Sequence, residues 1–513
     1  MLAISVHLVT TQHERDGTRS LQIGIGYNSL VMNGVKSNGI KPGYNIMTWG
    51  CQMNEEDSEQ MALFLEGMGY TPVSDPSEAE VVLLNTCHVR QKPVEKVYSK
   101  LGELREIKLL RPEMIIGVCG CMAQVESALI KRRAPFVDLV VGTGNIAAIP
   151  NLILSVKQKR TTGNGRRTDH HDLNRSIVNR RTSIVEELSL PPRQGAVVTN
   201  IPLRNVLRKP KLKAHVPIMY GCDKFCTFCI VPFTRGRERS RPTNDILMEI
   251  NGLSRGGTKE VTLLGQTVNS YGKNMAEGRV PFARLLSMIN DIRGIERIRF
   301  TSPYPRDFTD ELIEAIATLP KVCEHVHLPL QVADDDLLER MHRGYTVARF
   351  REIVNKLRTV VPGIAITTDI MLGFPGETDQ QFQNTMRFVE ETRFDSAFMF
   401  AYSVRTGTKA AEMEDQIPQT VKIERLTRLI ELQNRITSEI NQSHVGETFE
   451  ILVEGKSAKD PTKLTGLSRT MKTMNFTGPG LRGTSAEQMN GKLIQVRVAE
   501  GHLTGFTGEY SGA

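Results

Sequence analysis

The sequence contains no run approaching the ~20 apolar residues that a membrane-spanning helix requires, so it does not predict an integral membrane protein. Its first residues lack the basic segment and the longer apolar stretch of a secretory signal. Arg15 and Arg19 are offset by Glu14 and Asp16, which is a poor match to a transit peptide. We therefore expect a cytoplasmic protein that does not bind a membrane.

The composition also lacks the bias of a disordered, collagenous or coiled-coil protein. Hydrophobic residues make up 40% and charged residues 24% of the chain, with 42 Gly and 24 Pro, as is typical of a soluble globular protein. At about 150 residues per domain, a length of 513 residues predicts roughly three domains.

Positive charge is concentrated in residues 151–220. This segment holds 14 Lys and Arg but only four Asp and Glu, whereas the whole chain has a net charge of +8. The rest of the chain is therefore slightly acidic. A basic segment of this kind is either a solvated linker or an electrostatic footprint for a polyanion such as RNA.

Three of the eight cysteines form a compact C-x₃-C-x₂-C motif at Cys222, Cys226 and Cys229. Disulfides are not expected, because cytosolic thiols are kept reduced. Three thiolates at this spacing can bind three irons of a four-iron cluster and leave the fourth iron open for chemistry. A zinc site normally needs a fourth ligand at a defined spacing, which the sequence does not offer, and buried inert cysteines are a further alternative. We interpret the motif as an iron–sulfur site.

A second, dispersed set comprises Cys51, Cys87 and Cys121, about one strand–helix unit apart. Each follows an apolar segment that we predict to be a strand, and a helical pattern comes next. The three segments are residues 44–49, 81–84 and 114–118. Because parallel strands end at one edge of a sheet, the thiols are expected to converge there. Spacing alone fits a second cluster and small buried residues equally well, and Cys119 competes with Cys121 for the third position.

With both cysteine patterns in view, residues 44–510 resemble the methylthiotransferase family of radical S-adenosylmethionine (SAM) enzymes. The compact motif, with Phe228 before its last cysteine, is similar to the family's radical SAM cluster loop. The dispersed cysteines match the ligands of its second, auxiliary four-iron cluster. In that family Cys121, and not Cys119, would be the third ligand.

Several further motifs resemble the branch of the family that modifies isopentenyladenosine in tRNA. Residues 50–54 read Gly-Cys-Gln-Met-Asn, whereas the branch acting on a ribosomal protein tends to carry Pro-Lys at Gln52 and Met53. The other matching segments are residues 265–272, 299–303, 343–346, 368–369 and 373–378. The chain departs from the family pattern after Gln331 and at residues 403–408, close to expected SAM and substrate contacts.

The resemblance implies a specific reaction. It is the radical SAM-dependent methylthiolation of C2 of N6-isopentenyladenosine beside the anticodon, giving 2-methylthio-N6-dimethylallyladenosine. The C2–H bond is not acidic enough for a side-chain base, so a radical supplied by a cofactor is the reasonable route. The alternatives are methylthiolation of threonylcarbamoyl-adenosine or of a ribosomal protein, and, more distantly, a non-catalytic iron–sulfur protein that binds RNA.

The resemblance also implies cofactors and partners. The cofactors are two [4Fe–4S] clusters and SAM, with the catalytic cluster on the compact motif. The SAM contacts are expected at Gly265, Gln266, Asn269, Gln331 and Asp369, where glycine permits close backbone approach. The partners are the tRNA anticodon loop, an electron donor such as flavodoxin or ferredoxin, and a sulfur donor. The protein itself is expected to be a monomer.

The fold class predicted from the strand–helix rhythm and the resemblance is α/β with three domains. Residues 44–155 are expected to form an N-terminal α/β methylthiotransferase domain, and residues 214–442 a central partial (β/α)₆ radical SAM barrel. Residues 443–511 are expected to form a small all-β TRAM barrel that binds RNA. Residues 1–43 are interpreted as a disordered extension and residues 156–213 as a mobile basic linker.

Six apolar runs predict the strands of the central barrel. They are residues 216–220, 261–264, 298–301, 325–330, 364–370 and 396–402. In β/α barrels the chemistry lies at the C-terminal ends of the strands. The compact cysteine motif, Gly265 and Gln331 all come directly after predicted strands, which favours the barrel interpretation.

The TRAM segment carries the predicted RNA contacts. Four basic residues and no acidic residue lie between Asp460 and Glu487, which by itself also fits a solvated loop. Given the resemblance, Arg469 and Lys472 are candidates for phosphate contact and Phe476 for base stacking.

Overall fold

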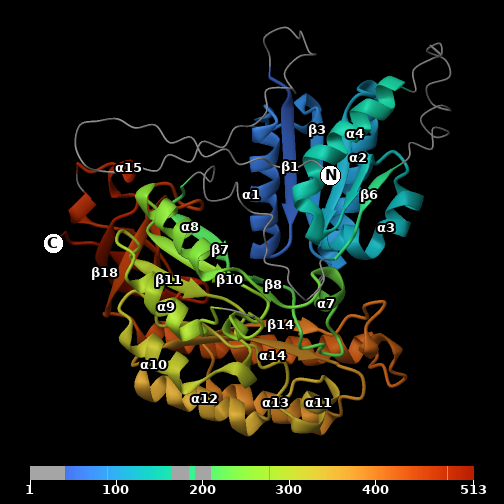
Figure 1. Cartoon of the computed structure of the whole chain (residues 1–513). Coiled ribbons are helices and arrows are strands. Elements are labelled where there is room, and N and C mark those ends of the chain that lie inside the picture. Colours follow the sequence, from blue (N-terminus) through green and yellow to red (C-terminus); the bar gives the residue numbers. More distant parts are fainter. Residues whose placement is uncertain are drawn as a thin grey trace. The chain divides into compact units, whose positions relative to one another are not determined.

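The computed structural model of this chain describes residues 41–88, 91–162, 184–190, 210–275, 278–481 and 483–512 (Figure 1). The disordered extension expected at residues 1–43 lies outside the described residues, apart from its last three. Most of the expected basic linker also lies outside them. In the part of the chain that the structure describes, no helix has the length and apolar character to cross a membrane.

The N-terminal domain is built on one parallel sheet of six strands in the order β2-β1-β3-β4-β5-β6. The strands are β1 (Gly43–Trp49), β2 (Thr71–Pro72), β3 (Val81–Thr86), β4 (Ile115–Gly120), β5 (Leu139–Val141) and β6 (Val185–Glu187). The helices are α1 (Gln52–Gly67), α2 (Gln91–Leu110), α3 (Cys121–Arg133) and α4 (Ile149–Thr162). Strands β3 and β4 are buried along their whole length, as expected for a sheet packed on both faces.

Two elements of this domain extend past the boundary predicted at residue 155. Helix α4 continues to Thr162, and β6, inside the expected linker, pairs in parallel with β5. Lys131 of α3 forms an ion pair with Glu186, which fastens β6 to the domain. Strand β6 has only three residues, which is too short to show the alternation of a strand, and it lies far along the chain from β5. Only the folded structure therefore reveals this edge strand.

The central domain has all six predicted strands, and all of them pair in parallel. They form two three-stranded sheets, in the orders β7-β10-β11 and β12-β13-β14. The strands are β7 (Lys213–Pro217), β10 (Glu260–Leu264), β11 (Arg297–Phe300), β12 (His325–His327), β13 (Ala365–Leu372) and β14 (Ser396–Ala401). Between the two sheets a single parallel bridge joins Ile298 to Val322. The end of the first predicted run forms a separate strand, β8 (Met219–Tyr220), which pairs with β9 (Arg239–Ser240).

The longer barrel helices are amphipathic, and four of the barrel helices begin at a residue whose side chain caps the first turn. The bounds of the barrel helices are α7 (Val231–Thr234), α8 (Thr243–Arg255), α9 (Phe282–Asn290), α10 (Asp310–Thr318), α11 (Asp335–Arg340), α12 (Val347–Val360), α13 (Asp379–Thr392) and α14 (Gln419–Ser443). In α12 the buried side chains of Phe350, Ile353, Val354 and Leu357 recur at helical spacing and face the core. Thr378 and Gln381 form a capping box that starts α13.

The C-terminal domain is a closed barrel of five strands in the order β15-β16-β17-β19-β18. The strands are β15 (Thr448–Lys456), β16 (Leu464–Ser468), β17 (Thr473–Thr477), β18 (Leu493–His502) and β19 (Gly505–Glu509). The alternation at Ile494, Val496 and Val498 predicts an inward face, and these side chains are buried in the barrel core. This closed barrel is consistent with the expected TRAM domain.

Candidate active site

The dispersed cysteines lie at the C-terminal ends of three neighbouring strands. Cys51 follows β1, Cys87 follows β3, and Cys121 begins α3 directly after β4. The backbone N–H of Cys87 donates to the carbonyl of Trp49 at 2.9 Å, so the first two strand ends are aligned. The thiols of Cys51 and Cys87 are hydrogen-bonded to each other, and Cys121 is close enough to both Cys51 and Arg235 to interact electrostatically.

The environment of Cys51 stabilises a thiolate. The hydrogen bond from Cys87 lowers the pKa of Cys51 to about 5 against the opposing effect of burial, and the cation of Arg235 contributes in the same direction. The backbone N–H groups of Met53 and Asn54, in the first turn of α1, also donate to this sulfur. A helix N-terminus favours negative charge, so the position of Cys51 before α1 stabilises its thiolate form.

A buried amide pair fixes the two loops that carry Cys51 and Cys87. The Asn85 side chain donates to the carbonyl of Asn54 at 2.8 Å and to the Ser58 hydroxyl at 2.9 Å, and the Asn54 amide donates back to Asn85 at 3.2 Å. At Gly120, φ is +88°, and an added Cβ would lie 2.3 Å from the Asn85 side-chain oxygen. Only glycine fits there, so this position holds β4 close to the amide pair.

Arg235 links the two cysteine sites and was not singled out by the sequence. It follows α7, and its guanidinium donates to the Asp57 carboxylate of α1 at 2.7 Å, with both side chains buried. Arg235 thus carries a cation from the central domain to the dispersed cysteines. The sequence offers no pattern that separates this arginine from others, because its partner lies 178 residues away.

Cys119 lies apart from the other cysteines of the N-terminal domain. It belongs to β4 and is buried in an apolar cluster with Ile115, Leu139 and Val141. Burial raises the pKa of its thiol to about 12. Cys119 packs on aliphatic side chains and interacts electrostatically with Asp57, whereas Cys121 interacts with Cys51 and Arg235, which supports Cys121 as the functional cysteine of this segment.

The compact cysteines lie in the loop between β8 and α7. Burial raises the pKa values of Cys222 and Cys229 to about 12, and nearby thiols act in the same direction, so the three sulfurs are neighbours. Backbone bonds fix the loop, since the Cys222 N–H donates to Gly236 and the Thr227 N–H donates to Met341.

The donor chemistry of both cysteine sets suits an iron–sulfur cluster. No group of three or more His, Cys, Asp or Glu side chains in the described residues is already arranged around a metal position. In the compact set all three thiols interact with one another, and in the dispersed set Cys51 interacts with both Cys87 and Cys121. Thiolates are the usual ligands of such clusters. Iron bound at Cys222 and Cys229 would displace the thiol protons and so offset the raised pKa values of these two groups.

Arg343 is the second functional residue that the sequence left without a role. Its guanidinium donates to the Cys226 sulfur at 3.3 Å and to the Tyr345 hydroxyl at 3.1 Å. It also lies 5.1 Å from the ring centroid of Tyr304 and 5.3 Å from that of Tyr345. The buried arginine therefore places a permanent cation beside Cys226.

The residues expected to contact SAM lie at the C-terminal ends of the barrel strands, but some have structural partners. Gly265 directly follows β10, and a Cβ added there would lie 2.6 Å from the Met219 side chain, so its small size is needed for packing. The side-chain oxygen of Gln266 is buried and has no partner in the described structure. Both ends of the Asn269 amide bond the backbone of Tyr304, at 2.9 and 2.7 Å, so Asn269 positions this loop.

Gln331 and Asp369 form a second group on the other half of the barrel. Gln331 has a left-handed φ of +71°, and its backbone bridges to Asp369 and Met371 on β13. Asp369 lies 3.4 Å from the imidazole of His327 on the neighbouring strand. Both side chains are thus brought to the same end of the barrel.

The predicted RNA contacts in the C-terminal barrel are corrected by the structure. Phe476 is fully buried in the barrel core and cannot stack on a base. Arg469 donates to both oxygens of Glu324, at 2.7 and 2.8 Å, and Lys472 lies 3.3 Å from Asp395. Both acidic partners precede barrel strands of the central domain. The two basic residues therefore dock the C-terminal barrel instead of presenting free charge to RNA.

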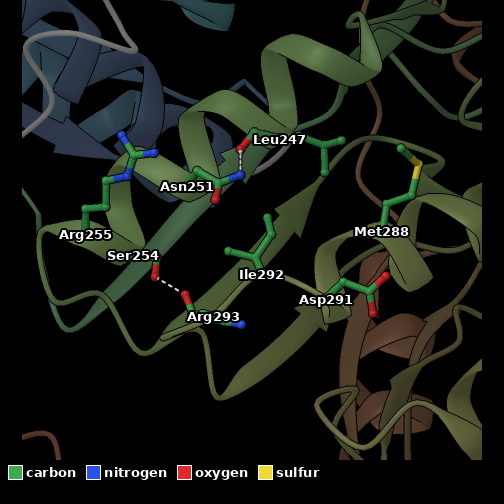
Figure 2. Close-up of a pocket in the computed structure, with 8 residues that line it drawn as sticks. All are labelled: Leu247, Asn251, Ser254, Arg255, Met288, Asp291, Ile292 and Arg293. Carbon is green, nitrogen blue, oxygen red and sulfur yellow. Dashed lines mark hydrogen bonds between the residues drawn. The ribbon is translucent and has the colours of Figure 1, made fainter. Parts of the chain in front are cut away.

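A surface pocket of about 420 Å³ lies away from all these residues (Figure 2). It is formed by the ends of α8 and α9 and includes Asn251, Ser254 and Arg293. In a β/α barrel the C-terminal ends of such helices adjoin the N-terminal ends of the strands, where residues contribute to stability rather than chemistry. The pocket holds neither a cysteine nor a predicted SAM contact.

Comparison with known families agrees with this architecture. Residues 43–142 match the family described as "Uncharacterized protein family UPF0004", and residues 216–389 match the radical SAM superfamily. Proteins of that superfamily use SAM and a [4Fe–4S] cluster, which are therefore cofactors of this chain. The chain also resembles the solved structure of the radical SAM methyltransferase TsrM from Kitasatospora setae, with a TM-score of 0.51 and 13% identity over 88% of this chain and 81% of that one. At this identity the likeness concerns the fold alone.

Curated relatives match over nearly the whole length. A protein of Desulforamulus reducens is 46% identical over 91% of this chain and 95% of its own. A protein of Carboxydothermus hydrogenoformans is 44% identical over 90% and 97%, and one of Moorella thermoacetica is 44% identical over 91% and 98%. All three are named tRNA-2-methylthio-N(6)-dimethylallyladenosine synthase. The chain belongs to this family of radical SAM transferases.

Proposed function

We propose that this protein transfers a methylthio group to C2 of N6-isopentenyladenosine beside the anticodon of tRNA. The names of its relatives support this substrate. The observation that carries the proposal is the pair of three-cysteine sets, one on each of two domains, joined through the buried ion pair of Arg235 and Asp57. A reaction that needs both a radical and a sulfur atom requires two such sites close together.

Cys222, Cys226 and Cys229 are the residues proposed to hold the [4Fe–4S] cluster that works with SAM. When bound, this cluster and SAM supply the one-electron chemistry that removes hydrogen from an unactivated carbon. Arg343 orients Cys226 by its hydrogen bond, and the side chains of Cys222 and Cys226 are buried. Gly265, Gln266, Gln331 and Asp369 remain the proposed contacts to SAM, with Asn269 supporting them through Tyr304.

Cys51, Cys87 and Cys121 are the residues proposed to hold a second [4Fe–4S] cluster. When bound, that cluster supplies the sulfur that the product gains. The shared hydrogen bond of Cys51 and Cys87 and the lowered pKa of Cys51 support this assignment, because a thiolate is the form that binds iron. The guanidinium of Arg235 offsets the negative charge of the thiolates, and its ion pair with Asp57 holds it in place.

The reaction also requires partners that the chain does not contain. An electron donor such as flavodoxin or ferredoxin is proposed to reduce the cluster on the compact motif, and a separate donor to replace the sulfur consumed. The enzyme is proposed to act as a monomer in the cytoplasm, where it meets tRNA.

The test is an anaerobic assay with the reconstituted protein, SAM, a reductant and tRNA that carries N6-isopentenyladenosine. Mass spectrometry of the digested nucleosides should detect 2-methylthio-N6-dimethylallyladenosine, and SAM should be cleaved. A product from threonylcarbamoyl-adenosine or from a ribosomal protein instead would identify one of the alternative substrates. Absence of SAM cleavage by the reduced, cluster-loaded protein would contradict any radical mechanism.

A further inference from the structure

Two phenylalanines beside the cysteine sites expose their rings to solvent. Phe225 is 38% and Phe233 51% exposed. Their ring centroids are 6.3 Å apart, with an edge-to-face angle of 81°. Large aromatic side chains are usually covered, and a contiguous exposed pair marks a surface that binds something.

The exposed pair lies on the chain segment that runs from the compact cysteines to Arg235. Phe225 stands immediately before Cys226 in the cluster loop, and Phe233 is in α7, two residues before Arg235. Arg235 reaches the dispersed cysteines through Asp57, and α7 contacts α3, which begins at Cys121. In the proposed reaction one adenine must be accessible to both cysteine sites, so the nucleotides next to that adenine come close to the segment that carries the two rings.

The local backbone holds Phe225 in place. Its φ is +49°, a left-handed conformation that is unfavourable for a bulky residue. The backbone bonds of Cys222 and Thr227 on either side of it fix the loop that imposes this conformation. Strain of this kind is retained mainly at functional sites.

A cation completes the surface. The guanidinium of Arg237 lies 5.0 Å from the ring centroid of Phe225, and Asp223 accepts a hydrogen bond from its Nε at 2.5 Å. Aromatic rings combined with arginine are the groups on which unpaired RNA bases stack. The combination fits a nucleobase better than it fits a purely apolar partner, which would gain nothing from the guanidinium.

We propose that Phe225, Phe233 and Arg237 form a stacking platform for an unpaired RNA base adjacent to the target adenosine. The inference rests on the proposed function and specifies how its substrate is held. A base that is modified on its edge must leave the stack of its neighbours. The platform replaces the stacking that those neighbours lose and thereby holds the loop open at the site.

The test measures the binding of an anticodon stem-loop RNA containing N6-isopentenyladenosine to the reconstituted, cluster-loaded protein. A double Phe225→Leu, Phe233→Leu variant keeps apolar bulk but removes the π faces, and should bind about 10-fold or more weakly, since base–aromatic stacking contributes on the order of a factor of ten per base. Phe233→Trp keeps a π face and should bind within about twofold of the wild type. Met248→Leu, at a side chain 56% exposed on α8, is the matched control and should bind like the wild type.

Two further readouts separate stacking from other roles of these rings. A 2-aminopurine base beside the target should be quenched by the wild type and the Trp variant but not by the double Leu variant. The difference in affinity should persist as salt rises, because stacking, unlike phosphate contact, releases no counterions.

Three outcomes would overturn the platform. In the first, the double Leu variant binds RNA as tightly as the wild type. In the second, the double Leu variant loses cluster iron. In the third, the double Leu variant binds SAM more weakly but binds RNA normally. These outcomes are distinct from failure of the proposed function, which would appear as absence of methylthiolated product with the wild-type protein itself.

Discussion

The guanidinium of Arg343 donates a hydrogen bond to the sulfur of Cys226 at 3.3 Å and contacts the rings of Tyr304 and Tyr345. Arginine keeps its charge at any pH at which the protein is folded. A cation next to a cluster ligand favours the reduced, more negative state of the cluster. Arg343 is therefore a positioning residue whose removal should change the electron affinity of the site.

Replacement of Arg343 by Met should lower the midpoint potential of the compact-motif cluster by about 50–100 mV, since 59 mV is a tenfold change for one electron. A potentiometric titration followed by electron paramagnetic resonance measures it. Arg343→Lys retains the charge but loses the planar guanidinium, so the cluster potential in this variant should lie between those of the wild type and Arg343→Met. Arg351→Gln on the exposed side of α12 is the control. An unchanged potential in Arg343→Met, with only lower thermal stability, would assign Arg343 a purely structural role.

The two cysteine sets should hold separate clusters. Simultaneous replacement of Cys222, Cys226 and Cys229 by Ala should leave about four irons per chain after anaerobic reconstitution, because the other three thiols form their own site. Iron and sulfide analysis measures the content. A content of about eight irons, or of none, would show that the partition is wrong.

Cys119 and Cys121 should differ sharply although only Gly120 separates them. Cys119→Ala should retain both clusters and turnover, because its thiol packs among aliphatic side chains. Cys121→Ala should lose the second cluster and the methylthiolated product while SAM cleavage continues. Iron content and product analysis check both variants, and the opposite pattern would reverse the assignment.

The metal-free protein should show one unusually reactive thiol. The pKa of Cys51 is lowered to about 5, so the rate of its alkylation by iodoacetamide should rise as the pH increases through 5. The rate should be at its maximum by about pH 7, where the Cys51 thiol is fully ionised. Cys119, with a pKa raised to about 12, should remain unmodified at pH 7. Peptide mass spectrometry after timed alkylation gives the pH profile of each. Cys87→Ala removes the hydrogen bond to Cys51 and should move its profile to higher pH. Equal alkylation of Cys51 and Cys119 in the folded protein would contradict this environment.

The positions of the strands and of the cysteines could be predicted from the sequence because both depend on local patterns. Short apolar runs identified β1, β3 and β4, and the parallel topology then placed the thiols at one edge. The roles of Arg235 and Arg343 could not be predicted, because they depend on partners 178 and 117 residues away.

The predicted RNA contacts in the C-terminal barrel were wrong for a related reason. A basic residue in a loop looks the same whether it faces solvent or a neighbouring domain, and the alternation of β17 did not distinguish a stacking ring at Phe476 from a core ring. Only the packed barrel shows that Phe476 faces inward and that Arg469 meets Glu324. Beside the cysteines, the exposed aromatic side chains are those of Phe225 and Phe233, and Phe398 on β14 is exposed as well.

Arg469 should therefore contribute to stability rather than to RNA affinity. Its guanidinium forms two hydrogen bonds with Glu324 and a third with the carbonyl of Val322 at 2.7 Å, all partly buried between two domains. Arg469→Gln leaves the Glu324 carboxylate without its partner and should destabilise the docked barrel by about 1–3 kcal/mol.

Urea unfolding of the wild type, Arg469→Gln, Glu324→Gln and the double variant gives the coupling between the two side chains. The double variant should be less destabilised than the sum of the single variants, because removing both partners leaves no unpaired buried charge. Lys459→Gln, an exposed change on the same barrel, is the control and should be neutral. An unchanged stability of Arg469→Gln together with a salt-dependent loss of tRNA affinity would restore Arg469 as a phosphate contact.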